Sequence, residues 1–251
     1  MRFSVISASG HGFKTLNDMS ASQIADTVLD PVRMAKRLEL FREIPLKSLQ
    51  AQTDQKFKCI VLVSKLLGEE FKTQLRDLAT QNKFLKIEEV GQDEDPAENC
   101  SKYIRQGTVT FRIDDDDAIH PAQVETLKST AARIRPNTVI SFPNGFAVGA
   151  KDEFVLFQPR RWVVNAQGIA YVSNKKRRSI FELGSHTKLD RYRMELCETP
   201  RAWMRSIHKG SDSGARITKN TPFISVLPEF MREHAPEYDF IDFERVQKLL
   251  A

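Results

Sequence analysis

An unbroken apolar run at residues 59–63, Cys-Ile-Val-Leu-Val, constrains the fold of this chain more than any other feature. The run has the length of a strand, and a strand without polar residues is covered on both faces, as in parallel sheets. After it, Phe71, Leu75 and Leu78 recur at helical spacing, which predicts a helix over about residues 69–81. We therefore expect a buried strand followed by a helix that covers one face of its sheet.

The same alternation extends to either side of this pair. We expect further strands at 3–6, 85–87 and 108–113, and further helices at about 31–43 and about 96–105. Strands that alternate with helices up to about residue 135 predict an α/β fold, with a mainly parallel sheet and helices on both faces.

The second half of the chain has a different pattern. Its short apolar segments are separated by Pro143, Asn144-Gly145 and Gly168, residues that favour hairpin turns. We expect the following elements here: strands at 138–142, 154–157 and 169–172, a short helix at 200–207 and a closing helix at 240–250. The length of 251 residues suits one domain, with one half at 1–135 and a smaller antiparallel half at 136–251.

Four consecutive aspartates, at residues 114–117 and called here the acidic run, follow the alternating strand at 108–113. Crowded carboxylates raise one another's pKa, and a divalent cation removes that cost. Ligands of open α/β sheets bind at the carboxyl ends of strands, where this run lies. Hard oxygen ligands favour Mg²⁺ or Mn²⁺. The alternative is a solvated acidic turn before a helix that starts at Pro121.

Two segments carry a resemblance to a known family. In the segment 45–57 the residues Ser-Leu, Gln-Thr and Phe form an "SL..QT...F" run before the strand at 59–63, similar to the passage from first helix to second strand in GT-A glycosyltransferases. The segment 111–121, Phe-Arg-Ile-Asp-Asp-Asp-Asp-Ala-Ile-His-Pro, is similar to their DxD segment. Together with Arg33, Arg37 and Leu40-Phe41, residues 30–125 most resemble the bacterial family of "putative rhamnosyltransferases".

This resemblance implies an activity and a fold. The fold would be the Rossmann-like GT-A fold, with the antiparallel half of the chain on the acceptor side. The activity would be metal-dependent transfer of a sugar, rhamnose by the family's name, from a nucleotide-sugar donor to a glycan or lipid-linked acceptor of a surface polysaccharide. The cofactor would be Mn²⁺ or Mg²⁺, because the ion must neutralise a departing diphosphate.

The resemblance also implies roles for individual residues. Asp116 is the first choice for a metal ligand and Asp117 the second, and His208 would complete the metal or diphosphate site. The implied nucleotide-sugar contacts are Asp114, Asp115, Ser64, Arg112 and Lys209. Ser64 stands where many GT-A enzymes have an aspartate that contacts the nucleobase, and a serine can hydrogen-bond a pyrimidine edge. For His208 and Lys209 the alternative is an exposed loop after a helix.

An inverting transferase also needs a carboxylate that accepts the proton of the acceptor hydroxyl. Asp190 and Glu182 lie at a suitable distance along the chain and are the candidates. The alternative for each is an ordinary surface charge.

Charge and cysteine content limit the partners and the compartment. The formal charge of +5 and the basic run at 175–178 favour an anionic partner. We expect no nucleic acid, because basic residues interleaved with stacking aromatics are missing. Three widely spaced cysteines predict a reducing compartment. Without a signal peptide or a membrane span we expect a cytoplasmic protein, with peripheral contact at the inner face of the membrane left open.

Two other classes of function remain open from the residues alone. A phosphatase or phosphotransferase can also place an aspartate nucleophile after an apolar strand, although its motif follows the first strand, whereas here three strands come before. A noncatalytic protein that binds polyanions through the basic runs would merely tolerate the acidic run.

Overall fold

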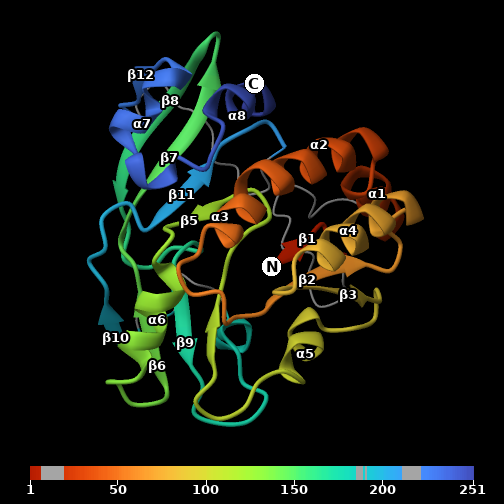
Figure 1. The fold of residues 1–251 in the computed structure, drawn as a ribbon. Helices are drawn as coiled ribbons and strands as arrows, with labels where there is room; N and C mark the ends of the chain where they lie inside the picture. Colours follow the sequence, from red (N-terminus) through yellow and green to blue (C-terminus); the bar gives the residue numbers. More distant parts are fainter. Residues whose placement is uncertain (7–19, 185–188, 190, 211–221) are drawn as a thin grey trace.

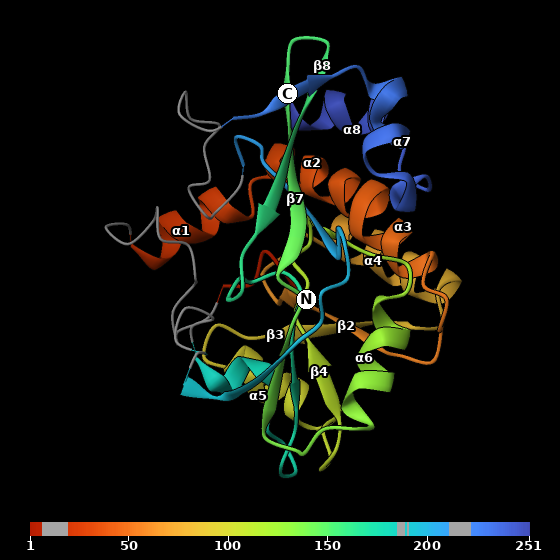
Figure 2. The same ribbon diagram turned by 90° about the vertical axis from the view of Figure 1, so that its left-hand side faces the viewer.

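The computed structural model describes residues 1–6, 20–184, 189, 191–210 and 222–251. The strands of these residues form a three-stranded parallel sheet and two mixed sheets of four and five strands. Figure 1 shows the parallel sheet with helices above and below it on one side of the molecule, and the two mixed sheets on the other side. Figure 2, turned by 90°, shows the same elements from the side.

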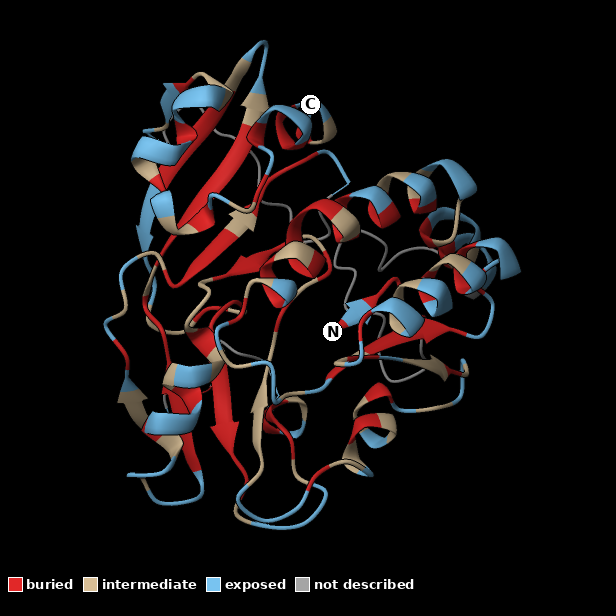
Figure 3. Cartoon of the chain, in the orientation of Figure 1, coloured by how far each residue is buried: buried red, intermediate tan, exposed pale blue. Residues whose placement is uncertain are grey.

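The parallel sheet has the order β1 (Arg2–Phe3), β2 (Cys59–Ser64) and β3 (Leu85–Val90). Val61 and Val63 pack with residues of α2 (Pro31–Phe41) and α4 (Glu69–Gln81). On the opposite face, Leu62 packs with Cys100 of α5 (Pro96–Ser101). The prediction of a strand covered on both faces is therefore confirmed, and α4 has the predicted bounds. Figure 3 shows the buried interior of this sheet in red.

The first long helix begins as the sequence predicts. The Asp30 side chain accepts a hydrogen bond of 2.8 Å from the backbone amide of Arg33, and Pro31 occupies the first turn, where no amide partner is needed. Instead of ending near residue 43, the helix continues as a π-helical turn, Arg42–Leu46, and then as α3 (Lys47–Gln50). Pro45 lies inside the π turn because proline cannot donate the regular helical hydrogen bond. A further helix, α1 (Ala21–Val28), precedes α2 and was not predicted.

The strand before the acidic run does not belong to the parallel sheet. It is β4 (Val109–Phe111), at the edge of a sheet with the order β10-β6-β9-β4. The other members are β6 (Thr138–Ser141), β9 (Ile169–Val172) and β10 (Arg193–Leu196). Only β6 and β10 are parallel in this sheet, and β4 pairs antiparallel with β9. The α/β class is confirmed, but the purely parallel sheet has three strands and the antiparallel part is more extensive than expected.

The five-stranded sheet corrects two predictions. Its order is β12-β8-β7-β11-β5, with bounds β5 (Ala118–Ile119), β7 (Asn144–Lys151), β8 (Phe154–Arg161), β11 (Trp203–Ser206) and β12 (Ile224–Val226). Asn144-Gly145 begins β7 rather than forming a turn, and the β7–β8 hairpin turns at Asp152-Glu153 instead. The helix predicted at 200–207 is wrong, because this segment is β11, which lies between β7 and β5.

Of the remaining helices, α6 (Gln123–Ala131) packs on the four-stranded sheet and α8 (Phe243–Leu250) packs on β7 of the five-stranded sheet. The others are the single turn α7 (Met231–His234) and short 3₁₀ turns at Ile180–Leu183, Pro228–Phe230 and Pro236–Tyr238. The helix predicted at 240–250 is confirmed as α8, which begins three residues later than predicted. It packs against β7 and α2 and so joins the two halves of the molecule.

Trp203 is the largest fully buried side chain of the described residues. Its indole amine donates a 2.9 Å hydrogen bond to the carbonyl of Phe142, as a buried tryptophan requires. Its ring lies directly over Gly145 of β7 and beside Gly168, which has a positive φ of 74°. The two glycines therefore leave the space that the indole fills.

Gly145→Ala tests this close approach. A Cβ at Gly145 would lie 2.1 Å from Cδ2 of Trp203, so the ring or the strand must shift, and we expect a loss of about 1–3 kcal/mol in the free energy of unfolding. Urea denaturation followed by circular dichroism measures it. The matched control is Gly68→Ala, whose Cβ would meet its nearest atom at 3.7 Å and should cost less than about 1 kcal/mol. Equal losses in both variants would contradict the contact.

The structure describes all three cysteines. Cys59, Cys100 and Cys197 are buried and free, and burial raises the pKa of each thiol. Every helix within the described ranges is too short or too polar to cross a membrane.

Candidate functional site

The acidic run lies in the connection between β4 and β5. Strand β5 pairs antiparallel with β11, with Ile119 opposite Trp203 and Ala118 opposite Met204. This pairing brings the residues at the end of β11 next to the acidic run, although about 90 positions separate them in sequence. The segment that carries Ser206 and His208 is therefore one wall of the site, and α2 provides a second.

Asp116 contacts His208. Oδ2 of Asp116 lies 3.0 Å from Nε2 of His208, and the two side chains are 14% and 1% exposed. On its other side the imidazole accepts a 3.1 Å hydrogen bond at Nδ1 from the amide of Gly210. Burial would raise the pKa of Asp116, but the hydrogen bond from His208 and the positive charges of Arg37 and Arg205 outweigh it and lower that pKa. Asp116 is therefore held as a carboxylate.

Asp115 forms a buried ion pair with Arg37 of α2. Nε of Arg37 donates to Oδ2 at 3.0 Å and a terminal nitrogen donates to Oδ1, so the pair is bidentate. Both side chains are less than a tenth exposed. Burial raises the pKa of Asp115 to about 6, against the opposing charge of Arg37. This pair ties the acidic run to α2.

Asp117 is turned into the protein. Oδ1 accepts a 2.9 Å hydrogen bond from the backbone amide of Ser206, and Oδ2 accepts one from the side-chain amide of Gln167. The same Gln167 amide donates to Asp114 at 3.3 Å. Burial and the charges of Asp116 and Asp114 raise the pKa of Asp117 well above its ordinary value. Because both oxygens are engaged, the structure gives Asp117 a structural role and leaves Asp116 as the better candidate ligand.

The four aspartates therefore do not gather around one point. Asp115 and Asp116 have separate partners, Asp114 and Asp117 share the Gln167 amide, and these protein groups supply much of the compensation that the sequence alone assigns to a cation. Within the residues that the structure describes, no group of three or more His, Cys, Asp and Glu side chains is arranged to hold a metal. Asp116 and His208 remain as the two candidate protein ligands of a metal ion.

The donor set of this pair fits a divalent ion. Two adjacent ligands of an octahedral ion with bonds of ~2.1 Å lie ~3.0 Å apart, and the observed distance between Oδ2 and Nε2 is 3.0 Å. A carboxylate suits Mg²⁺ or Mn²⁺, whereas an imidazole favours Mn²⁺ over Mg²⁺. Since Nδ1 accepts from Gly210, Nε2 carries the ring proton here. Coordination through Nε2 would therefore require the Gly210 amide to release Nδ1.

The other predicted nucleotide-sugar contacts, Ser64, Arg112 and Lys209, lie in three separate parts of the fold. Ser64 is buried at the end of β2, where its hydroxyl accepts a 3.2 Å hydrogen bond from the Leu66 amide. The Arg112 guanidinium lies over the ring of Phe181 at 5.1 Å, burial lowers its pKa, and its buried Nε has no hydrogen-bond partner among the described residues. Lys209 is exposed and follows His208 directly.

Of the two candidate bases, Glu182 and Asp190, the structure describes only Glu182. The Glu182 carboxylate accepts hydrogen bonds from the amide and the hydroxyl of Ser179, and so caps the 3₁₀ turn Ile180–Leu183. This structural role leaves it poorly placed as a base. Asp190 lies outside the described residues.

Four residues of the site were missed as site residues: Arg37, Gln167, Arg205 and Ser206. Arg37 had been noted only as part of the family resemblance, because a basic residue on an amphipathic helix is typical of a solvent-facing side. Ser206 contributes a backbone amide, which has no sequence signal. Gln167 lies in the turn just before β9. The sequence of a turn does not indicate a hydrogen-bond partner 50 residues earlier in the chain.

Three comparisons relate the chain to known proteins, and the match to a family model agrees with the sequence resemblance. A family model described as "Putative rhamnosyl transferase" matches residues 1–220. Among solved structures, the chain is similar to Staphylococcus aureus TarS, residues 1–349, in complex with UDP-GlcNAc. The two share 17% identity over 86% of this chain and 68% of the TarS chain, with a TM-score of 0.47. No curated protein matches the chain.

Proposed function

Because this chain belongs to the family described as "Putative rhamnosyl transferase", we propose that it transfers rhamnose from a nucleotide-sugar donor with the help of a divalent ion. Membership of this family makes the chain a glycosyltransferase, so the phosphatase and the noncatalytic polyanion-binding protein are set aside. The metal dependence, the sugar and the acceptor are the proposed parts.

The contact between Asp116 and His208 carries the proposal for the metal. It joins a carboxylate that is held ionised to an imidazole at a distance suited to one shared ion. When bound, a divalent ion supplies charge neutralisation for the diphosphate that leaves the donor sugar. Asp116 and His208 would hold the ion, and one or two protein ligands are the usual number for an ion that also binds substrate phosphates.

The neighbouring groups hold this pair in place and set the local charge. Arg37 fixes Asp115 and so the path of the acidic run. Gln167 and the Ser206 amide fix Asp117. The positive charge of Arg205 acts on both Asp116 and Asp117, and a guanidinium at this position favours a diphosphate beside the carboxylates. Lys209, exposed next to His208, adds a second cation for the phosphates.

The acceptor is proposed as a glycan or a lipid-linked glycan at the inner face of the membrane, as the family resemblance implies. The carboxylate that removes the proton of the acceptor hydroxyl stays a prediction for Asp190. Arg112, half-buried beside Phe181, is proposed as a contact of the nucleotide-sugar donor through its buried Nε, which has no hydrogen-bond partner among the described residues.

Thermal shift with nucleoside diphosphates tests the proposal directly. We expect one of UDP, dTDP or GDP to raise the unfolding midpoint in the presence of Mn²⁺ and much less in its absence. A ligand at a hundred times its Kd adds about 2.7 kcal/mol, which for a chain of this size is roughly 5–10 °C. Mg²⁺ should give a smaller shift, because an imidazole ligand favours Mn²⁺.

A pair of histidine variants is the control. His208→Ala should remove most of the Mn²⁺-dependent part of the shift. His234 lies on α7, and its ring centroid is 5.5 Å from that of Phe157 in β8. His234→Ala should keep the Mn²⁺-dependent part of the shift even if the starting midpoint is lower. A shift that is the same with and without Mn²⁺ in the unchanged protein would refute the metal site, and no shift with any nucleotide would refute the donor class.

A further inference from the structure

Exposed cations gather at one end of the four-stranded sheet. The register of the strands places one residue of each in a row across the sheet: Arg193, Thr138, Val172 and Val109. The segments that adjoin β4, β6 and β9 beyond this row are 102–108, 132–137 and 173–179. Figure 1 shows these connections together at the lower end of the sheet that carries the labels β6 and β9, and Figure 3 shows them as largely exposed.

The three segments carry positive charge without negative charge. None of them contains Asp or Glu, although over the whole chain 33 acidic residues nearly match 38 basic ones. Their exposed cations and the one at the start of β10 form a surface called here the basic end: Arg105, Arg135, Lys175, Lys176, Arg177 and Arg193. In the part of the chain that the structure describes, these six side chains form no ion pair. Positive charge from four separate parts of the sequence therefore meets on one surface.

Hydrogen bonds hold these segments against one another. The Arg177 amide donates to the carbonyl of Ile104 at 3.1 Å, and the Gly107 amide donates to the carbonyl of Ser173 at 2.8 Å. From the third segment, the Asn137 amide donates to the last residue of β9 at 2.8 Å. The cations are therefore presented in a fixed arrangement.

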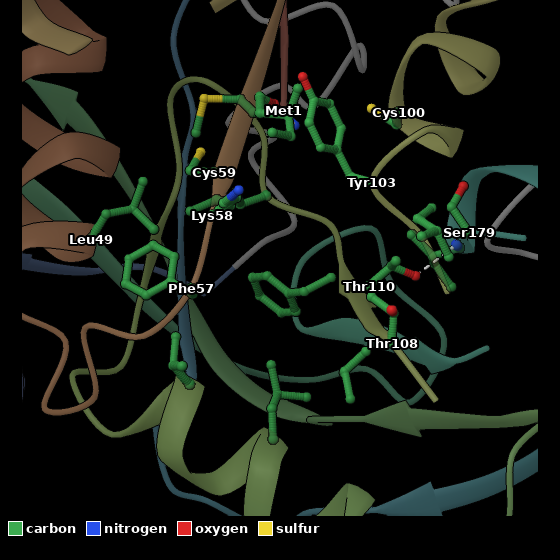
Figure 4. A pocket seen from close by; sticks show the side chains of 18 of the residues that line it. Met1, Leu49, Phe57, Lys58, Cys59, Cys100, Tyr103, Thr108, Thr110 and Ser179 are labelled. Atoms are coloured by element: carbon green, nitrogen blue, oxygen red, sulfur yellow. Dashed lines mark hydrogen bonds between the residues drawn. The ribbon is translucent and has the colours of Figure 1, made fainter. Parts of the chain in front are cut away.

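The turn that carries Lys175 is also anchored from below. Its carbonyl accepts a 2.6 Å hydrogen bond from the hydroxyl of Ser173, which is buried. The Ile180 amide donates to the hydroxyl of Thr110 in β4 at 2.9 Å, and Figure 4 shows this bond as the dashed line between Thr110 and the chain at Ser179. The residues at this junction line an apolar cavity, and none of the six cations of the basic end is in its lining.

We propose that the basic end docks on a membrane surface of anionic phospholipid. The row of four strands is about 14 Å wide at ~4.8 Å per strand, so several phosphates of a planar headgroup layer can contact the cations at once. Each Lys or Arg near such a surface strengthens binding about fivefold. Among the described residues, no exposed large apolar side chain lies in the three segments, so the contact is electrostatic and sensitive to salt.

A nucleic acid suits this surface less well. Single strands bind by stacking their bases on aromatic rings, and Tyr103 is the one aromatic residue in the three segments. It is half-buried, its hydroxyl donates to Glu88, and the ammonium groups of Lys86 and Lys102 lie 4.8 and 5.3 Å from its ring centroid. Its ring is therefore already occupied.

Docking through the basic end would set the height of the candidate site above the membrane. The acidic run begins five residues after Val109 of the row, which at ~3.3 Å per residue is at most about 16 Å. A lipid-linked acceptor would have to present its sugar at about this height. This orientation of the acceptor rests on the proposed function, whereas the docking itself does not.

Cosedimentation with phospholipid vesicles tests the docking. The vesicles contain phosphatidylcholine alone or with about a third of phosphatidylglycerol. We expect binding to the anionic vesicles only, at least about tenfold weaker when salt rises from about 0.1 M to about 1 M, because the Debye length falls from ~10 Å to ~3 Å. The triple variant Arg135→Gln, Lys175→Gln, Lys176→Gln should bind about 100-fold more weakly, since each cation contributes about fivefold.

The matched control removes the same charges elsewhere. It is the triple variant Lys151→Gln, Arg232→Gln, Lys248→Gln, at exposed positions of β7, α7 and α8, which Figure 1 shows at the other end of the molecule. It should bind within about threefold of the unchanged protein, because distant charges are screened. Equal losses in both triple variants, or no binding to anionic vesicles, would overturn the proposal. Tighter binding to duplex DNA, lost in the first variant alone, would assign the surface to nucleic acid instead.

Reductive methylation of lysines measures the orientation independently. With anionic vesicles bound, Lys175 and Lys176 should react about fivefold more slowly or less, and Lys151 and Lys248 at their unchanged rates. Protection of all four lysines alike, or of none, would contradict docking through the basic end. Neither measurement uses a donor, a metal or an acceptor, so the docking can fail while sugar transfer stands, and the reverse.

Discussion

Replacing Asp116 by asparagine is expected to lower kcat by about a thousandfold, since the loss of ~4 kcal/mol of transition-state stabilisation has that effect. Asparagine has the same shape and can still accept from His208, but it removes the charge that would hold a divalent ion. The measurement is the release of nucleoside diphosphate from a nucleotide sugar, with Mn²⁺ varied. The variant should also need more Mn²⁺ for half of its remaining rate.

The matched control is Asp77→Asn on α4, which makes the same chemical change on an exposed side chain. Its rate should stay within about twofold of the unchanged protein. If Asp116→Asn keeps its rate and its dependence on Mn²⁺, Asp116 does not bind the ion, and the metal site must lie elsewhere. A fall in rate with unchanged Mn²⁺ dependence would point to a role in positioning instead.

The second large effect is on stability. Arg37→Ala should lower the free energy of unfolding by about 3–5 kcal/mol, because it leaves Asp115 buried without its partner. Arg37 and Asp115 are both nearly inaccessible to solvent and form a bidentate pair. Urea denaturation at neutral pH measures the loss.

Two further variants separate the ion pair from other causes. Lys36→Ala removes a neighbouring positive charge from α2, for which no ion pair is recorded within the described ranges, and should change stability by less than about 1 kcal/mol. In the double variant Arg37→Ala with Asp115→Asn, part of the loss should be recovered, because the uncompensated charge is gone. Strictly additive losses would mean that the two side chains act independently.

The sequence predicted those elements whose pattern is local. Helix α4 has the predicted bounds because its apolar spacing and the glycine before it are both in the sequence. Strand β9 was also predicted to the residue. Strand β2 was found because an unbroken apolar run can be buried only when both faces are covered.

Prediction failed where distant pairing decides the structure. The segment around Trp203 has apolar residues at spacings that suit a helix, but β7 and β5 pair with it on either side and make it a strand. Gly145 favours a turn by itself, yet it lies in β7 because only glycine admits the Trp203 ring. In both places tertiary contacts override the local preference.

The candidate site was predicted in part. The sequence predicted Asp116 and His208 as partners in one site, and the structure brings them to 3.0 Å. It did not predict that Arg37, Gln167 and Ser206 would compensate the other aspartates. A single sequence does not show which charges meet across α2 and the acidic run, and a backbone amide has no sequence signal at all.

Strand β11 links the core of the protein to the candidate site. The six residues 203–208, which are β11 and the two residues after it, carry Trp203 of the core, the amide that holds Asp117 and the imidazole that meets Asp116. A slip of β11 by one position would turn each side chain to the opposite face, so a molecule in which β11 is misaligned lacks the His208 contact of Asp116 and the Ser206 amide bond of Asp117. If Asp116 and His208 hold a divalent ion as proposed, that ion would therefore bind native molecules more tightly than compact molecules in which β11 is misaligned.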